Sequence, residues 1–114
     1  MRAWTLLMLI SCYRPPSACH RMCAEAAVGL EPCLEEDGLG WESYGYRDAE
    51  DFQDACETWA WEQEAIAREA SPEQGGGERG VRTLARTCKD LRTTFTEGTC
   101  EQRQSVAWSE PAWK

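Results

Sequence analysis

The stretch DAEDFQDACETWAWEQEAIAREA, residues 48–70, carries the clearest structural signal in this chain of 114 residues. Its apolar positions are spaced by three and four residues, as on one face of an α-helix. They are Phe52, Ala55, Cys56, Trp59, Ile66 and Ala70. Asp48 is a suitable N-cap, and Asp51 three residues later resembles the second member of a capping box. Because Ser71-Pro72 cannot continue the pattern, we predict a helix over residues 48–70.

Three further helices are expected around it. Residues 80–95 repeat the three-four spacing, and residues 18–29 place Cys19 and Cys23 on one helix face. Thr99 and Gln102 have capping-box spacing, which predicts a short helix from there to about Trp108.

The remaining segments are expected to be irregular. We expect Pro32 to interrupt the first helix, residues 31–47 to form a connection with at most a short helical turn, and residues 109–114 to be a loose tail. No strand alternation is present. The predicted fold class is therefore all-α, a small disulfide-stapled hairpin or bundle of three to four helices.

The cysteines should hold this fold together. Beyond residue 11 the chain has only 11 Leu, Ile, Val and Phe residues, which is little for a hydrophobic core. Six cysteines occur in the same region: Cys19, Cys23, Cys33, Cys56, Cys88 and Cys100. Three bridges would each contribute about 2–4 kcal/mol. Cys19 and Cys23 are one helical turn apart and should reach different partners; 15 complete pairings are open.

The seventh cysteine closes the run Leu9-Ile10-Ser11-Cys12, which follows Arg2 and a short apolar segment. This run resembles the lipobox of bacterial lipoprotein precursors, and the resemblance covers only the first 12 residues. It implies that residues 1–11 are a signal peptide, that Cys12 is lipidated, and that the protein is anchored by acyl chains in the bacterial cell envelope. Residues 12–17 would be a short tether and residues 18–108 a disulfide-rich helical domain. The alternative is secretion after cleavage at Ala18.

Composition argues against two classes of partner. Without Arg2 the chain has 11 basic and 20 acidic residues, so we expect neither nucleic-acid binding nor electrostatic attraction to anionic lipid. Acidic side chains occupy one side of residues 48–70 (Glu50, Asp54, Glu57, Glu64), and basic ones follow residues 80–95 (Arg82, Arg86, Lys89). We interpret these charges as mutually docked or solvated faces.

No catalytic constellation or cofactor motif is recognisable. His20 is the only histidine and is interpreted as a surface residue, since no nucleophile motif accompanies it. A metal site formed by Cys19, His20 and Cys23 is an alternative, although an exported chain normally oxidises its thiols.

The aromatic residues are the best remaining indication of function. Trp41, Tyr44 and Tyr46 cluster in the glycine-rich connection, and Trp61 falls among acidic side chains. Exposed Trp and Tyr side chains often contact partners, but they can also cover a thin core. The expected function is a non-catalytic structural or interaction module near the membrane, whose partner is an envelope protein or polymer. A secreted binding domain using these aromatic residues is the alternative.

Overall fold

The computed structural model describes residues 17–114, and within them the fold is helical throughout. The described residues form four α-helices: α2 (Ser17–Glu36), α3 (Ala49–Glu69), α4 (Glu78–Glu97) and α5 (Cys100–Gln104). Two short 3-10 helices, η1 (Trp41–Tyr44) and η2 (Pro72–Gln74), lie in the connections. The described region contains no strand, so the predicted all-α class is confirmed. The lipobox-like run and most of the tether lie outside the described residues.

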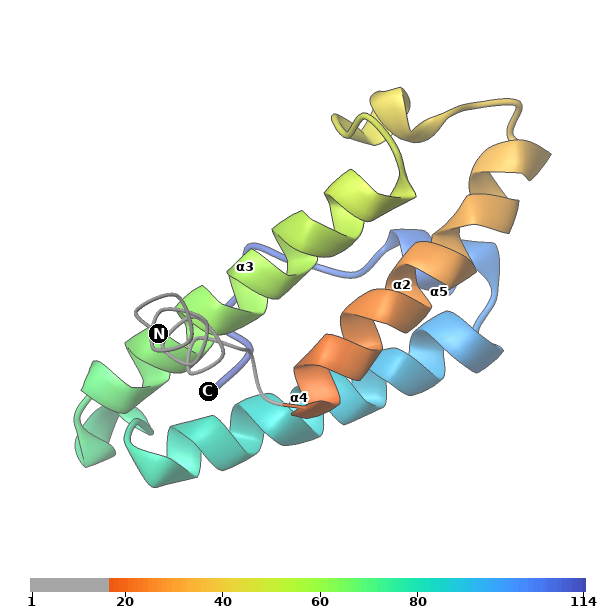
Figure 1. Ribbon diagram of the computed structural model, residues 1–114. Coiled ribbons are helices and arrows are strands. Elements are labelled where there is room, and N and C mark those ends of the chain that lie inside the picture. Colours follow the sequence, from red (N-terminus) through yellow and green to blue (C-terminus); the bar gives the residue numbers. More distant parts are fainter. Residues whose placement is uncertain (1–16) are drawn as a thin grey trace, which may run out of the picture.

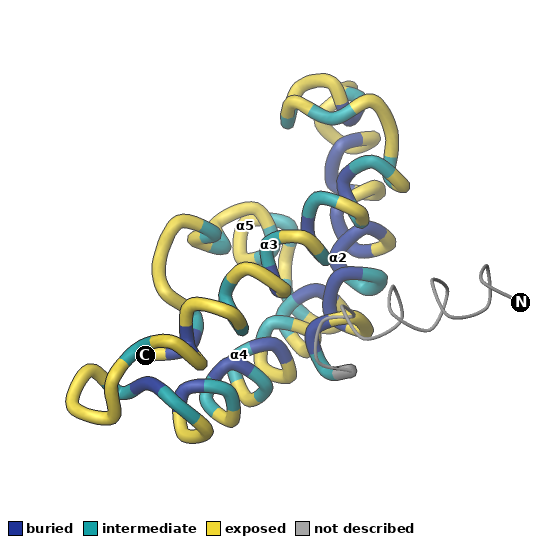
Figure 2. The backbone as a smooth tube through the Cα atoms, turned by 60° about the vertical axis from the view of Figure 1, so that its left-hand side comes forward, coloured by how far each residue is buried: buried dark blue, intermediate teal, exposed yellow. Residues whose placement is uncertain are grey.

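The three long helices pack on one another. As Figure 1 shows, α3 and α4 diverge from the loop around η2, and α2 lies between their far ends. α2 packs against both α3 and α4, and α5 packs against α2 and α4. The buried positions follow the inner side of each helix, whereas the connections are largely exposed (Figure 2). α2 is therefore the central helix of the bundle.

Small side chains dominate the contacts between the helices. Ala26, Ala60 and Ala67 are fully buried, as are the half-cystines Cys19 and Cys23. Gly29 shows how close the helices come: a Cβ atom there would lie 2.4 Å from the carbonyl oxygen of Phe95 on α4. A chain with few large aliphatic residues thus forms its core by bringing helices close together.

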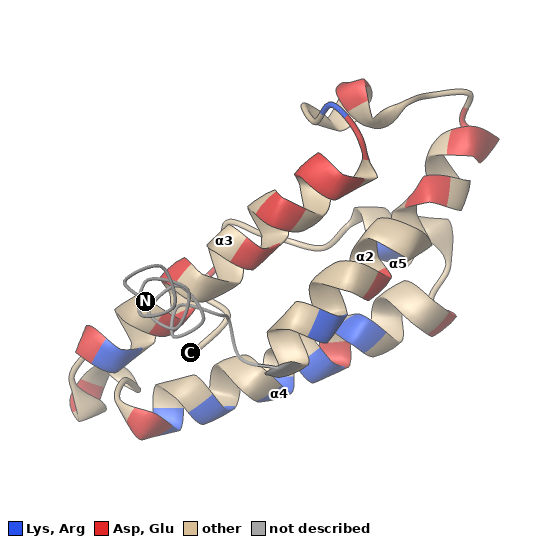
Figure 3. Cartoon of the chain, in the orientation of Figure 1, with Lys and Arg blue, Asp and Glu red and all other residues tan. Residues whose placement is uncertain are grey.

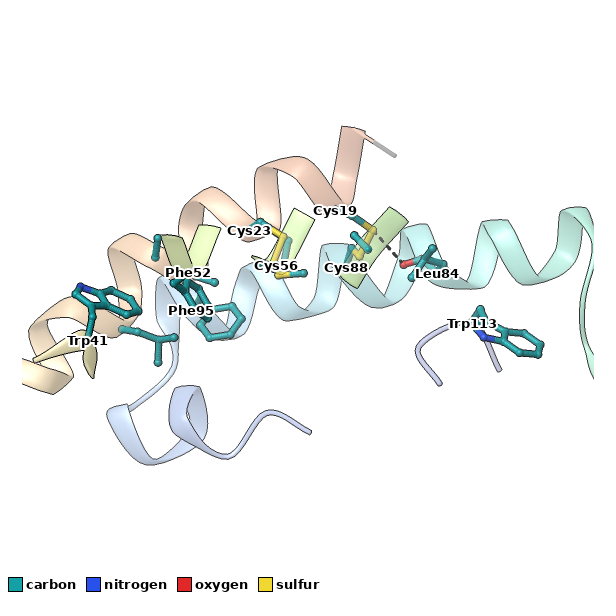
Figure 4. Packing of buried hydrophobic residues seen from close by; sticks show 14 of the residues in the cluster. Cys19, Cys23, Trp41, Phe52, Cys56, Leu84, Cys88, Phe95 and Trp113 are labelled. Carbon is teal, nitrogen blue, oxygen red and sulfur yellow. Dashed lines mark hydrogen bonds between the residues drawn. A yellow bond between two sulfur atoms is a disulfide. The ribbon is translucent and has the colours of Figure 1, made fainter. Parts of the chain in front are cut away.

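Three disulfides cross this core, and each begins in α2. Cys19 pairs with Cys88 of α4, Cys23 with Cys56 of α3, and Cys33 with Cys100 at the start of α5. The first two bridges are buried in the core (Figure 4). As expected, Cys19 and Cys23 reach different partners. The Cys19 sulfur also lies 4.0 Å from the Leu84 carbonyl oxygen, a packing contact, since a bridged sulfur has no proton to donate.

The first helix is longer than the sequence predicted. We expected Pro32 to interrupt it, but α2 continues to Glu36 with Pro32 inside. Proline removes the N–H that would pair with the carbonyl of Val28. Val28 is 68% exposed, so this side of the helix faces the solvent. Beyond the proline, Cys33 and Leu34 are buried, and their tertiary contacts hold the last turn.

The chain after α5 is also more ordered than expected. We predicted a loose tail over 109–114, and this was wrong: Trp113 is only 6% exposed and belongs to the hydrophobic core. The backbone N–H of Ala112 donates a hydrogen bond of 3.0 Å to the side-chain oxygen of Gln63 on α3. This C-terminal segment covers part of the space between α3 and α4 (Figure 1). The fourth helix itself ends at Gln104, before the predicted end at Trp108.

The predicted helix caps are present. The Asp48 side chain accepts a hydrogen bond of 2.8 Å from the backbone N–H of Asp51. The Asp51 carboxylate in turn accepts one from the backbone N–H of Arg47, one residue before the cap. Thr99 and Gln102 form a complete capping box. These pairs satisfy N–H groups that a helix start leaves without partners.

Candidate functional site

An aromatic cavity lies where the chain after α5 meets η1, α2 and α3. Its volume is about 210 Å³. Four rings line it: Tyr44, Tyr46, Phe52 and Trp108. Leu30 and Val106 add apolar surface, and Arg103 and Gln104 are the polar side chains of the wall. We call this space the aromatic cavity.

A turn at Gly45 brings the two tyrosines to the cavity. η1 ends at Tyr44, and Gly45 follows with φ of 89°, a left-handed conformation that favours glycine. The backbone N–H of Tyr46 then donates to the carbonyl of Trp41. The chain reverses within three residues, so both phenol rings line the same space.

The rings form a connected cluster that fixes the cavity wall. Phe52 stacks on Trp41, with 5.1 Å between ring centroids, and meets Tyr46 edge to face at 5.2 Å. Trp108 stacks on Phe95 at 6.0 Å and contacts Phe52 at 6.3 Å. Such contacts each contribute about 0.5–1.5 kcal/mol beyond the area they bury. Figure 4 shows Trp41, Phe52 and Phe95 together at this end of the core.

Arg103 is the cationic group of the cavity wall. Its Nη1 donates a hydrogen bond of 2.8 Å to the carbonyl oxygen of Gly29. Its Nε is buried and has no hydrogen-bond partner among the described residues. The ion pairs of the described region join Arg47 to Asp51 and Arg68 to Glu64, and Glu57 is in contact with His20, so no described carboxylate neutralises Arg103.

The predicted contact residues lie in three different places. Trp41 is 7% exposed and belongs to the core, where it supports Tyr44 and Phe52 from behind. Tyr44 and Tyr46 are half-buried at the aromatic cavity. Trp61 is 40% exposed on α3 and does not line that cavity. The sequence therefore indicated two of the four rings at the cavity, and missed Phe52, Trp108 and Arg103.

The metal hypothesis loses two of its three ligands. The sulfurs of Cys19 and Cys23 are both in disulfides and are not thiolates, the form that binds zinc or copper. In the described region no group of three or more His, Cys, Asp or Glu side chains is arranged to hold a metal ion. His20 is exposed, as expected for a surface residue, and contacts the Glu57 carboxylate of α3.

The charged faces of α3 and α4 do not pair with each other among the described residues. Figure 3 shows acidic residues along α3 and basic residues along α4. Arg82, Arg86 and Lys89 are all exposed. None of the ion pairs seen in residues 17–114 joins these two helices. Mutual docking of the two faces is therefore not seen among residues 17–114; on the acidic face, Glu57 contacts His20 of α2 and Glu64 pairs with Arg68 of α3.

One carboxylate near the start of α3 has a perturbed pKa. The backbone N–H and the guanidinium of Arg47 both donate to Asp51, and they hold the pKa of its carboxyl below the ordinary value. The same contact raises the pKa of Arg47. Both groups are at the protein surface, and the pair acts as part of the helix cap.

No helix of the described region is long and apolar enough to cross a bilayer.

Comparison of the chain with protein-family models, with curated proteins and with solved structures finds no match.

Proposed function

We propose that this protein is a small disulfide-stapled lipoprotein of the bacterial cell envelope, anchored through Cys12, that acts as a non-catalytic structural or interaction module. One observation carries the proposal. The three bridges use Cys19, Cys23, Cys33, Cys56, Cys88 and Cys100, so no other cysteine of the chain remains to pair with Cys12. Lipidation would remove that unpaired thiol.

The bridges also support an oxidising location. Disulfides persist in exported proteins and are rare in a reducing cytosol. Each bridge here closes a long loop, with sequence separations of 69, 33 and 67 residues. Long loops gain most from a covalent link, because the bridge removes more freedom from the unfolded chain.

Metabolic labelling with palmitate tests the anchor. The wild-type chain should incorporate the label and fractionate with membranes. Cys12→Ser should lose both properties, whereas Ser11→Ala, which keeps the cysteine and a small residue before it, should retain them. Label that survives Cys12→Ser, or a wild-type chain that takes up none, would contradict the proposal.

A second candidate function is a secreted binding domain. The aromatic cavity favours it, because Tyr44 and Tyr46 line a space that also contains a cationic side chain. The two candidates differ in location. An anchored protein stays with the cells, whereas a secreted one accumulates in the culture medium without acyl chains.

A further inference from the structure

The aromatic cavity combines a positive charge with flat apolar walls. Arg103 has no carboxylate partner in the described region, although the chain contains 20 acidic residues. Asp37 accepts a hydrogen bond of 3.3 Å from Gln104 but does not line the cavity. A half-buried guanidinium in such surroundings favours an anionic ligand.

The hydroxyl groups of the wall can add to this preference. The Tyr44 hydroxyl accepts a hydrogen bond of 3.0 Å from Gln104 and keeps its own proton to donate. The Tyr46 hydroxyl forms no hydrogen bond within the described chain. A carboxylate has only acceptor atoms and about four lone-pair sites. It therefore suits a wall that offers phenol protons together with the guanidinium protons of Arg103 that are neither buried at Nε nor bonded to the Gly29 carbonyl.

The size and shape of the cavity define the rest of the ligand. An apolar cavity of about 150 Å³ is large enough for benzene, and the aromatic cavity has a volume of about 210 Å³. Phe52, which is 5% exposed, and Trp108 are held by neighbouring rings, so the position of this wall is fixed before a ligand arrives. This leaves room for one planar ring and a short acidic substituent.

We propose that the aromatic cavity binds a small aryl carboxylate, with the ring against Phe52 and Trp108 and the carboxylate on Arg103. Tyr44 and Tyr46 contribute hydroxyl groups to the same carboxylate. The inference concerns the folded domain alone and does not depend on the anchor at Cys12. Binding and anchoring can therefore fail separately.

Calorimetric titration of the oxidised full chain tests the proposal with three probes. Phenylacetate carries both features, phenylacetamide replaces the carboxylate by a neutral amide, and acetate lacks the ring. Phenylacetate should bind with a Kd of about 1 mM or tighter, given its ten non-hydrogen atoms. The other two should bind at least about tenfold more weakly, because a charge-assisted hydrogen bond or the apolar contact is missing.

Three variants test which residues of the cavity wall hold the carboxylate. Arg103→Gln should abolish the preference for phenylacetate over phenylacetamide, whereas Arg82→Gln, an exposed arginine on α4, should retain it. Because Arg103 also holds the carbonyl of Gly29, Tyr46→Phe serves as a milder variant and should weaken phenylacetate binding severalfold. In the wild-type chain, the ¹⁵N resonance of Arg103 Nε should shift during the titration.

Three results would overturn the proposal. The first is equal affinity for phenylacetate and phenylacetamide. The second is that the folded wild-type chain does not bind phenylacetate at a concentration of about 30 times the expected Kd. The third is an Arg103 Nε resonance that does not shift during the titration. Membrane release of Cys12→Ser with phenylacetate binding intact would support the cavity and the anchor independently.

Discussion

The indole Nε1 of Trp59 donates a hydrogen bond to the backbone carbonyl of Trp108, 2.8 Å away, and the two rings meet edge to face with 5.0 Å between centroids. This pair ties the middle of α3 to the chain that follows α5. It fixes Trp108 as one wall of the aromatic cavity and directs the last six residues towards the space between α3 and α4. The C-terminal segment is thereby part of the core.

Trp113→Ala should strongly destabilise the protein. Trp113 is 6% exposed and packs near Gly80 of α4, so its truncation would leave a cavity. We expect the free energy of unfolding to fall by about 3–5 kcal/mol in urea denaturation. Ser109→Ala, at an exposed position of the same segment, should change it by less than about 0.5 kcal/mol. If the C-terminal segment were a loose tail, Trp113→Ala and Ser109→Ala would both change the free energy of unfolding by the same small amount.

Gly29→Ala should destabilise the protein, although alanine favours helices over glycine by about 1 kcal/mol. The new Cβ would meet the Phe95 carbonyl oxygen at 2.4 Å, and neither backbone can move away without separating α2 from α4. We expect a net loss of about 1–3 kcal/mol in the free energy of unfolding, measured by thermal denaturation.

Val28→Ala, on the exposed side of the same helix, is the matched control for Gly29→Ala and should be nearly neutral. A Gly29→Ala variant more stable than the wild type would show that the two helices are not in close contact there.

Removing the Cys19–Cys88 bridge should cost more than removing the Cys23–Cys56 bridge. All four half-cystines are buried, with exposures of 0–5%, so replacement of each pair by alanine disturbs the packing to a similar degree. The sequence separations are 69 and 33 residues. Removal of either bridge should lower the free energy of unfolding by about 2–5 kcal/mol. The loop-closure relation makes this loss about 0.6 kcal/mol larger for the bridge that closes the longer loop. Urea denaturation of both double variants measures the order, and the reverse order would contradict this account.

Asp51→Asn should show a pH-dependent effect on stability. Because hydrogen bonds from the backbone and guanidinium of Arg47 lower the Asp51 pKa, the folded protein favours the ionised carboxylate more than the unfolded chain does. The resulting stabilisation is present above the unfolded pKa and is lost as the pH falls through the lowered folded value.

The wild type should therefore be more stable than Asp51→Asn at neutral pH, and the difference should disappear in strong acid. Thermal denaturation across the acid range measures it. A difference that is constant with pH would show that the charge of Asp51 has no part in the effect.

Local signals in the sequence were enough to predict much of the fold. The three-four spacing around Cys56 and Cys88 predicted α3 and α4 to within two residues at each end. The caps at Asp48 and Thr99 are present because they depend on neighbouring residues alone. The continuation of α2 past Pro32 could not be predicted in this way, since it depends on the burial of Leu34 and on the bridge from Cys33 to Cys100.

The cavity was harder to predict than the fold for the same reason. Tyr44 precedes both Arg103 and Trp108 by more than 55 residues in the sequence. Only the tertiary fold places these three residues on one wall. The glycine-rich connection did indicate Tyr44 and Tyr46. Trp113, in a short proline-containing tail, has no periodic partner in the sequence that would indicate its burial.

Intact mass spectrometry of the native protein, extracted from its cells and measured before and after reduction, tests the central claim most directly: the fold is held by three disulfides in an oxidising compartment. Reduction should add six hydrogen atoms, one for each sulfur of the three bridges, and should abolish cooperative unfolding. The unreduced mass should fit a chain that begins at Cys12 and carries acyl groups. A native protein that is fully reduced and still unfolds cooperatively would contradict the account.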